Sequence, residues 1–153
     1  FNPARAFNAP TLFDLIVFSS YGFTDARYSG NHKDANTKGK RVENAPEHIL
    51  RAGVTLGYKK WLFTWQYSHV GQVFSDANNT VTPTTNGNNG LIPAYDITDI
   101  TLTYKMNNKF NIKGGLNNLF DSRYFTRRAG GYPGPCALPA DGRTFFISLQ
   151  AKL

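Results

Sequence analysis

The last eleven residues of the chain carry the pattern that most constrains its fold. Along this segment apolar residues alternate with mostly polar ones, and the apolar positions are Phe145, Ile147, Leu149, Ala151 and Leu153. Successive side chains of a β-strand point to opposite faces, so the alternation predicts a strand with one wholly apolar face. Edge strands of soluble sheets are usually blunted by charge or proline, and this one has no charged tail. The segment therefore needs a partner strand.

Similar alternation predicts five further strands. The six expected strands cover residues 12–28, 48–58, 61–74, 95–106, 110–126 and 142–153. Short turns, Lys59-Lys60 and Asn107-Asn108, follow the second and fourth strands, whereas long polar or Gly/Pro-rich segments follow the first, third and fifth. We interpret residues 75–93 as an exposed loop without periodicity and residues 129–141 as a Gly/Pro loop. The sequence therefore predicts an all-β, antiparallel fold with long and short connections in alternation.

Composition is compatible with such a sheet either in water or in a membrane. Mean hydropathy is −0.40, and no apolar run approaches the length of a membrane helix. Hydropathy alone would favour a soluble β-sheet binding module. In a transmembrane barrel, however, polar lumen residues cancel apolar lipid-facing ones, so the same value is expected there. Aromatic residues make up 14% of the chain, which suits strands of either kind and the aromatic girdles of barrels.

The net charge makes an anionic partner plausible: nucleic acid, lipopolysaccharide or an anionic chelate. The formal net charge is +7, from 17 Lys and Arg against 10 Asp and Glu. These positive residues are scattered through the chain rather than massed with aromatic residues on one element, so we expect no nucleic-acid partner.

No constellation of catalytic residues can be assembled from the sequence, and we expect no enzyme activity and no cofactor. His32, His48 and His69 lie in separate segments without metal-ligand spacing. The single cysteine, Cys136, excludes an internal disulfide and is interpreted as a loop residue.

Several motifs stand near the end of the chain: Gly-Leu-Asn-Asn-Leu-Phe-Asp-Ser-Arg-Tyr at 115–124, Tyr-Pro-Gly-Pro at 132–135, Asp-Gly-Arg-Thr-Phe-Phe at 141–146 and the apolar last residue. Together they closely resemble the C-terminus of TonB-dependent outer-membrane receptors. Residues 21–28 with 41–48, and 79–81 with 90–95, look most like the ferric-citrate and siderophore receptor branch. Residues 12–153 carry the resemblance, and residues 1–11 remain unassigned.

This resemblance implies a transmembrane antiparallel β-barrel fragment in the bacterial outer membrane, with long extracellular loops and short periplasmic turns. The chain would supply about the last six strands of a 22-stranded barrel. It would belong to a receptor that imports a ferric siderophore or ferric citrate, energised by the TonB complex through an N-terminal motif. That motif, the plug and a signal peptide are not recognisable here, so we expect a C-terminal fragment of a longer receptor. A small stand-alone outer-membrane barrel is the alternative, although six strands are fewer than bacterial barrels use.

Three arginines are the candidate ligand-binding residues. Arg127, Arg128 and Arg143 are expected at the extracellular mouth around one loop, where an arginine fork matches a carboxylate or phosphate group. They could therefore contact an anionic ferric chelate or a lipopolysaccharide phosphate. The alternative is that they are solvated rim charges paired with Asp121 or Asp141.

Two further segments have expected structural roles. In the Asn-Asn-Leu-Phe-Asp motif we expect Phe120 to face lipid, while Asn117 and Asp121 satisfy hydrogen bonds of the lumen or loops. The resemblance also implies that the terminal strand is recognised by the barrel-assembly machinery. The residues of that signal would be Phe145, Ile147, Leu149 and Leu153.

Overall fold

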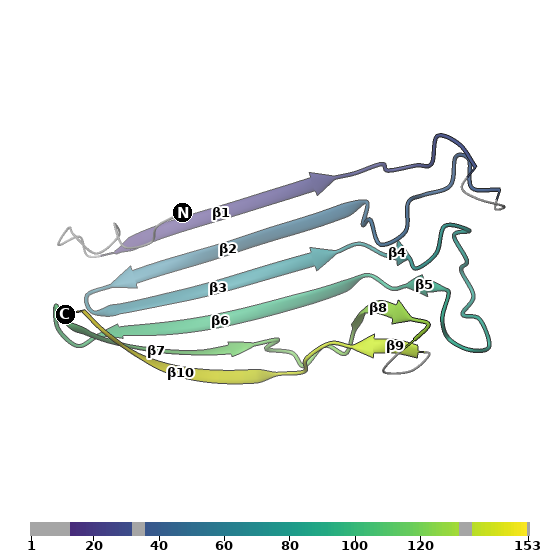
Figure 1. Ribbon diagram of the computed structural model, residues 1–153. Coiled ribbons are helices and arrows are strands. Elements are labelled where there is room, and N and C mark those ends of the chain that lie inside the picture. The colour runs from purple at the N-terminus through teal and green to yellow at the C-terminus, as the bar shows by residue number, and fades with distance from the viewer. Residues whose placement is uncertain (1–12, 32–35, 132–135, 153) are drawn as a thin grey trace.

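The computed structural model describes residues 13–31, 36–131 and 136–152, and the regular elements in them are all β-strands. Six long strands form one antiparallel sheet in the order β1-β2-β3-β6-β7-β10 (Figure 1). Their bounds are Asp14–Phe23 for β1, His48–Tyr58 for β2, Trp61–Val70 for β3, Tyr95–Lys105 for β6, Phe110–Asn117 for β7 and Thr144–Ala151 for β10. Within the described residues there is no helix long and apolar enough to cross a membrane.

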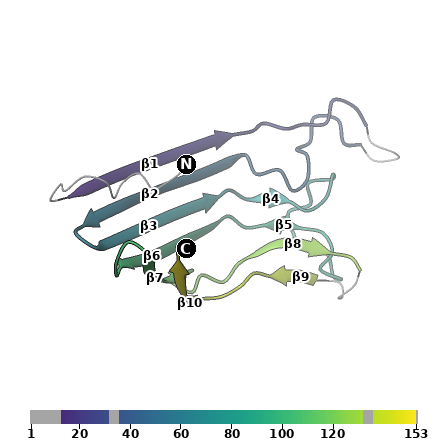
Figure 2. The ribbon, with the colours of Figure 1, turned by 60° about the vertical axis from the view of Figure 1, so that its left-hand side comes forward.

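Two short ladders lie beyond one end of the sheet. The strands β4 (Val73–Phe74) and β5 (Leu91–Ile92) pair with each other, as do β8 (Phe125–Ala129) and β9 (Cys136–Pro139). Figure 1 shows these ladders and the long connections gathered at one end, with the two short turns at the other. In Figure 2 the sheet is seen to curl, since β7 and β10 are turned away from the plane of β1 to β3. The sheet is open, with β1 and β10 as its edges.

Six strands in antiparallel order with alternating connections are thus confirmed, but several of their expected ends are wrong. The first expected strand stops at Phe23, the third at Val70 and the fifth at Asn117. The first and fifth strands are therefore shorter than the expected ranges 12–28 and 110–126. For β7 the physical reason is the next residue, Asn118, whose φ of 51° cannot continue a strand.

The two long C-terminal connections are also more ordered than expected. Residues 75–93 contain β5, and its Ile92, with 1% of its surface exposed, is the one hydrophobic residue fully buried in the described chain. Residues 129–141 contain β9, so Cys136 lies in a short strand rather than in a loop. Both strands are too short for a periodic pattern, and each exists because it pairs with the strand before it.

Cross-strand register brings the apolar residues of all six long strands to one face. Leu15 lies opposite Leu56, Leu56 opposite Phe63, and Phe63 opposite Leu102. The terminal strand continues this face, with Phe145 80% and Ile147 79% exposed. We call this side the apolar face and the opposite side the polar face. The alternation predicted for the terminal strand is confirmed within the described residues; Leu153 lies outside them.

On the polar face two phenylalanine rings lie across glycines of the adjacent strand. Phe18 of β1 is opposite Gly53 of β2, and Phe146 of β10 is opposite Gly115 of β7. A Cβ at Gly53 would lie 2.3 Å from a Phe18 ring atom, and one at Gly115 would lie 2.6 Å from a Phe146 ring atom. Neither position has room for a side chain. The close approach of the Phe146 ring therefore requires a glycine at position 115.

Candidate functional site

The three long connections meet at one end of the sheet and form the candidate functional site. They comprise residues 24–47, 71–94 and 118–143, as far as the structure describes them. Between them lies a hollow of about 180 Å³. Residues from all three connections and from the ends of β3 and β6 line it, namely Asn44, Pro46, Val70, Gly71, Val73, Ile92, Pro93, Tyr95 and Thr126.

Asn79 fastens the first connection to the second. Its Oδ1 accepts a hydrogen bond from the Arg41 backbone N–H at 2.8 Å, and its Nδ2 donates to the Arg41 carbonyl, also at 2.8 Å. Asn79 thereby satisfies both the N–H and the carbonyl of Arg41, as the backbone of a neighbouring strand would. A backbone hydrogen bond from Asn44 to the Phe74 carbonyl, 2.8 Å long, adds to the contact.

Arg128 fastens the third connection to the second. Its Nη1 donates to the Gly87 carbonyl at 3.1 Å and its Nη2 to the Leu91 carbonyl at 3.3 Å. The guanidinium carbon also lies 5.0 Å from the centroid of the Phe125 ring, a cation–π contact. Its Nε and the Asn88 Oδ1 are buried and have no hydrogen-bond partner among the described residues. Arg128 is thus held between two loops, with its charge facing neutral carbonyls.

Arg127 and Arg143 are exposed, unlike Arg128. Neither forms an ion pair with a carboxylate among the described residues, so the pairing with Asp121 or Asp141 is not observed there. Instead, the Asp121 carboxylate accepts a hydrogen bond from the backbone N–H of Arg143 at 2.9 Å. Arg143 directly precedes β10, and the alternation of that strand puts it on the side of Phe145, the apolar face.

The turn after β7 is built around Asn118, which is only 4% exposed. Its Oδ1 accepts the Ser122 N–H at 2.8 Å, and its Nδ2 donates to the carbonyls of Ser122 at 2.9 Å and Asp141 at 3.4 Å. Its own N–H donates to Asp99 of β6 at 2.8 Å. Asn118 thus joins β6, its own turn and the residues that lead into β10.

The structural interpretation of this motif agrees with the contacts. Asn117 donates to the Thr144 hydroxyl at 3.3 Å, Asp121 caps the Arg143 N–H, and Phe120 is 72% exposed. Sequence reasoning missed Asn118 as the central residue. The available signal was the Asn-Asn pair at the end of the strand, because asparagine is enriched at positive φ and in side-chain-capped turns.

Near the long connections the apolar face carries hydrogen-bonded polar side chains. The Tyr21 hydroxyl lies 2.7 Å from His48 Nδ1, and Asp96 Oδ1 lies 2.8 Å from His69 Nδ1 and 2.5 Å from the Tyr67 hydroxyl. No group of three potential metal ligands occurs in the described part of the chain, and His32 lies outside it.

In the first connection the Tyr28 hydroxyl hydrogen-bonds to Glu43. This bond is the main cause that raises the pKa of Tyr28, followed by burial and the negative charge of Glu43. The phenol therefore stays protonated, and it remains a hydrogen-bond donor, at neutral pH.

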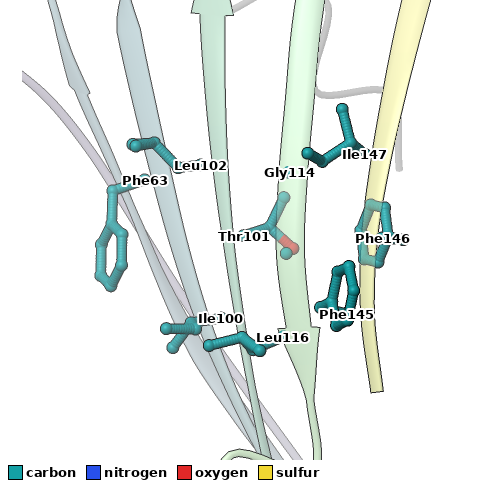
Figure 3. A pocket seen from close by; sticks show the side chains of 10 residues that line it. Phe63, Ile100, Thr101, Leu102, Gly114, Leu116, Phe145, Phe146 and Ile147 are labelled. Atoms are coloured by element: carbon teal, nitrogen blue, oxygen red, sulfur yellow. The ribbon is translucent and has the colours of Figure 1, made fainter.

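Further from the loops, the apolar face has a notch at Gly114 (Figure 3). The missing side chain leaves a hollow of about 410 Å³ between Leu102 on β6 and Ile147 on β10. Figure 3 shows the surrounding side chains of Phe63, Ile100, Leu116 and Phe145, all apolar. The hollow lacks the convergent polar groups that fix a specific small ligand.

Residues 4–119, more than half of the chain, match the family model described as TonB dependent receptor-like, beta-barrel. The chain belongs to the TonB-dependent receptor family. Family membership places it in the outer membrane of a bacterium, where the apolar face contacts lipid and the polar face lines the lumen. The long connections are then extracellular and the short turns periplasmic, as the sequence predicted.

Curated relatives of this receptor chain are named for different ligands. The vitamin B12 transporter BtuB of Vibrio cholerae is 27% identical over 113 residues, which is 73% of this chain and 18% of the transporter. The metal-pseudopaline receptor CntO of Pseudomonas aeruginosa is 26% identical over 145 residues, 88% of this chain and 18% of that receptor. The chain thus spans less than a fifth of the length of the curated relatives it matches.

Solved structures confirm the barrel fold of the receptor chain. The ferric citrate transporter FecA in its unliganded form superposes with a TM-score of 0.81 at 23% identity, covering 90% of this chain and 21% of that one. The closed form of the ferric-catecholate import receptor Fiu of E. coli gives a TM-score of 0.69 at 19% identity, covering 94% and 19%. The expected resemblance to TonB-dependent receptors is therefore confirmed, as is the open barrel segment.

Proposed function

We propose that this chain is the C-terminal part of an outer-membrane receptor that imports a ferric siderophore or ferric citrate. In this proposal residues 12–153 form about six of 22 barrel strands, residues 1–11 stay unassigned, and the chain has no enzymatic role. The supporting observation is the match to FecA over 90% of the chain, together with membership of a family of receptors and transporters. Energy would come from the TonB complex through the N-terminal part of the complete receptor.

A cobalamin or a metal–pseudopaline complex is the second candidate cargo, because the relatives BtuB and CntO are named for these ligands. Uptake assays in cells that depend on the complete receptor would separate the candidates. We expect TonB-dependent uptake of radiolabelled iron presented as ferric citrate or as a ferric siderophore. Uptake of labelled cobalamin, with no uptake of iron, would overturn the iron proposal.

Arg127, Arg128 and Arg143 are the proposed contacts with an anionic ligand. Arg127 is exposed on β8 and has no carboxylate partner among the described residues, which leaves its fork available to a carboxylate of the chelate. Arg128 contributes positive charge and holds β8 against the second loop. Arg143, on the side of the apolar face, is the one placed for a lipopolysaccharide phosphate.

Replacing Arg127 by Ala should weaken binding of the ferric chelate by about tenfold or more, because a hydrogen bond to a charged group contributes about 1.5–3 kcal/mol. The measurement is the Kd of the complete receptor in detergent, by fluorescence quenching. Lys38→Ala, an exposed cation on the first connection, is the control and should leave the Kd unchanged. Equal Kd values for wild type and Arg127→Ala would remove this arginine from the site.

The terminal strand is the proposed signal for the barrel-assembly machinery, through Phe145, Ile147, Leu149 and Leu153. Deleting Leu153 should lower the amount of membrane-inserted receptor several-fold, because the apolar alternation that the sequence predicts for this strand loses one member. Quantitative immunoblotting of outer-membrane fractions measures this. Gln150→Ala, a change on the opposite face of the same strand, serves as the control. Normal insertion after the deletion would count against the signal.

A further inference from the structure

Lysines gather at the end of the sheet that carries the short turns. Lys59 and Lys60 form the first turn, Lys109 follows the second, Lys105 ends β6 and Lys152 directly follows β10. We call these five residues the lysine rim. Asp14, on the polar face of β1 opposite Gly57, is the acidic residue that the structure describes at this end. The rim is therefore strongly basic.

Backbone hydrogen bonds place the lysines of the rim in cross-strand pairs. The Lys105 N–H donates to the Lys60 carbonyl at 2.8 Å, and the Lys152 N–H donates to the Lys109 carbonyl at 2.8 Å. Like charges opposite each other destabilise a sheet. In the described structure Lys59, Lys60, Lys109 and Lys152 form no ion pair with a carboxylate, and the Lys60 ammonium donates to the neutral Met106 carbonyl at 3.2 Å. An anion beside Lys109 and Lys152 would relieve the repulsion of this pair.

An aromatic belt lies on the apolar face immediately beside the lysine rim. It consists of Tyr58, Trp61, Tyr104 and Phe110. The ring centroids of Trp61 and Tyr104 are 4.5 Å apart, and the Lys59 ammonium lies 5.1 Å from the centroid of Tyr58. Such rings sit at the boundary between hydrocarbon and headgroups, and lysines extend their apolar stems past that boundary to keep the ammonium in water. The Lys59 ammonium therefore lies at headgroup level, and the other turn lysines, Lys60 and Lys109, are close enough to the belt to reach it. Lys105, which lies opposite Asn111, is on the polar face instead.

We propose that the lysine rim binds the phosphates of anionic phospholipids in the periplasmic leaflet. The aromatic belt and the apolar face continue directly from the rim, so a lipid can place its headgroup on the lysines and its acyl chains on the adjoining apolar side chains. An acidic protein bound at the same place would use only the lysine charges and would leave the adjoining aromatic belt without a role. The proposal rests on the periplasmic position of the short turns and is independent of which ligand the receptor imports.

The test uses the complete receptor that contains this chain, in mixed micelles with equal amounts of phosphatidylglycerol and phosphatidylethanolamine. Lipids retained after washing are quantified by mass spectrometry. We expect phosphatidylglycerol to be enriched about tenfold or more over phosphatidylethanolamine, and about 0.5 M salt to reduce the enrichment by screening. Lys60→Gln with Lys109→Gln should lower the ratio by roughly fivefold for each lysine removed.

Two control variants distinguish an effect of the lysine rim from an effect of the protein's total charge. Lys38→Gln with Lys40→Gln removes the same charge at the extracellular end and should leave the ratio unchanged, and Lys60→Arg with Lys109→Arg should preserve it. Equal retention of both lipids by the wild type, or the same loss in both glutamine variants, would overturn the proposal. A photo-cross-linker at position 109 that captures a protein in cells, without phosphatidylglycerol enrichment in micelles, would assign the rim to an acidic protein instead.

Discussion

Replacing Asn118 by Ala should destabilise the complete receptor by about 3–4 kcal/mol. The change removes three side-chain hydrogen bonds and leaves the Ser122 N–H and the carbonyls of Ser122 and Asp141 without that partner. A lost hydrogen bond in a buried setting contributes about 1 kcal/mol, and more where the partner stays unsatisfied. Alanine also tolerates the φ of 51° less well than asparagine. Urea-induced unfolding in lipid vesicles, followed by tryptophan fluorescence, measures the difference.

The neighbouring asparagine supplies the control for this experiment. Asn117 is exposed and makes one side-chain bond of 3.3 Å to Thr144, so Asn117→Ala should cost less than about 1 kcal/mol. Asn118→Gly removes the backbone strain at this φ but does not restore the three side-chain hydrogen bonds. It should therefore recover only a minor part of the stability that Asn118→Ala loses. Equal unfolding midpoints for Asn117→Ala and Asn118→Ala would show that the buried side chain does not hold the turn.

Placing a valine at Gly115 should destabilise the receptor by about 3 kcal/mol. A Cβ there would lie 2.6 and 2.7 Å from two Phe146 ring atoms and 2.9 Å from the Ile100 carbonyl oxygen, so the ring has to leave the strand it covers. Forced overpacking costs about 1–3 kcal/mol, and the displaced ring loses its burial in addition. The same urea titration detects the change, and less receptor should reach the outer membrane.

Two variants test whether the ring is the cause. Gly114→Ala adds its Cβ on the apolar face, where the nearest atom would be the Phe146 carbonyl oxygen at 3.6 Å, so stability should change by less than about 0.5 kcal/mol. Phe146→Ala should make Gly115→Ala far less harmful, because the clashing ring is gone. If Gly115→Ala cost the same in the presence and absence of Phe146, the ring would not be responsible.

The six long strands could be predicted from sequence because each separates two different surroundings. Leu50, Ala52, Val54 and Leu56 alternate with Arg51, Gly53, Thr55 and Gly57, and the register places the two sets on opposite faces. A sheet one layer thick, with lipid on one side and lumen on the other, imposes this period of two on every strand. In the structure, the register pairs the apolar residues of neighbouring strands across this face.

The organisation of the extracellular connections could not be predicted in the same way. It depends on single hydrogen bonds between residues far apart in sequence: Asn79 contacts a residue 38 positions away, and Arg128 one 41 positions away. No periodic signal marks such contacts, since each uses one side chain and the backbone of another loop. For the same reason, sequence reasoning placed Arg128 in a ligand cluster without showing that two of its nitrogens serve the second loop.

The two ties at the extracellular end give the connections a shared mechanical response. Asn79 joins the first connection to the second, and Arg128 joins the third to the second. The second connection therefore links the other two through hydrogen bonds. A force applied to any one of them is divided among all three, because movement of one loop alone must first break bonds to its neighbour. These three connections should therefore move together rather than one at a time.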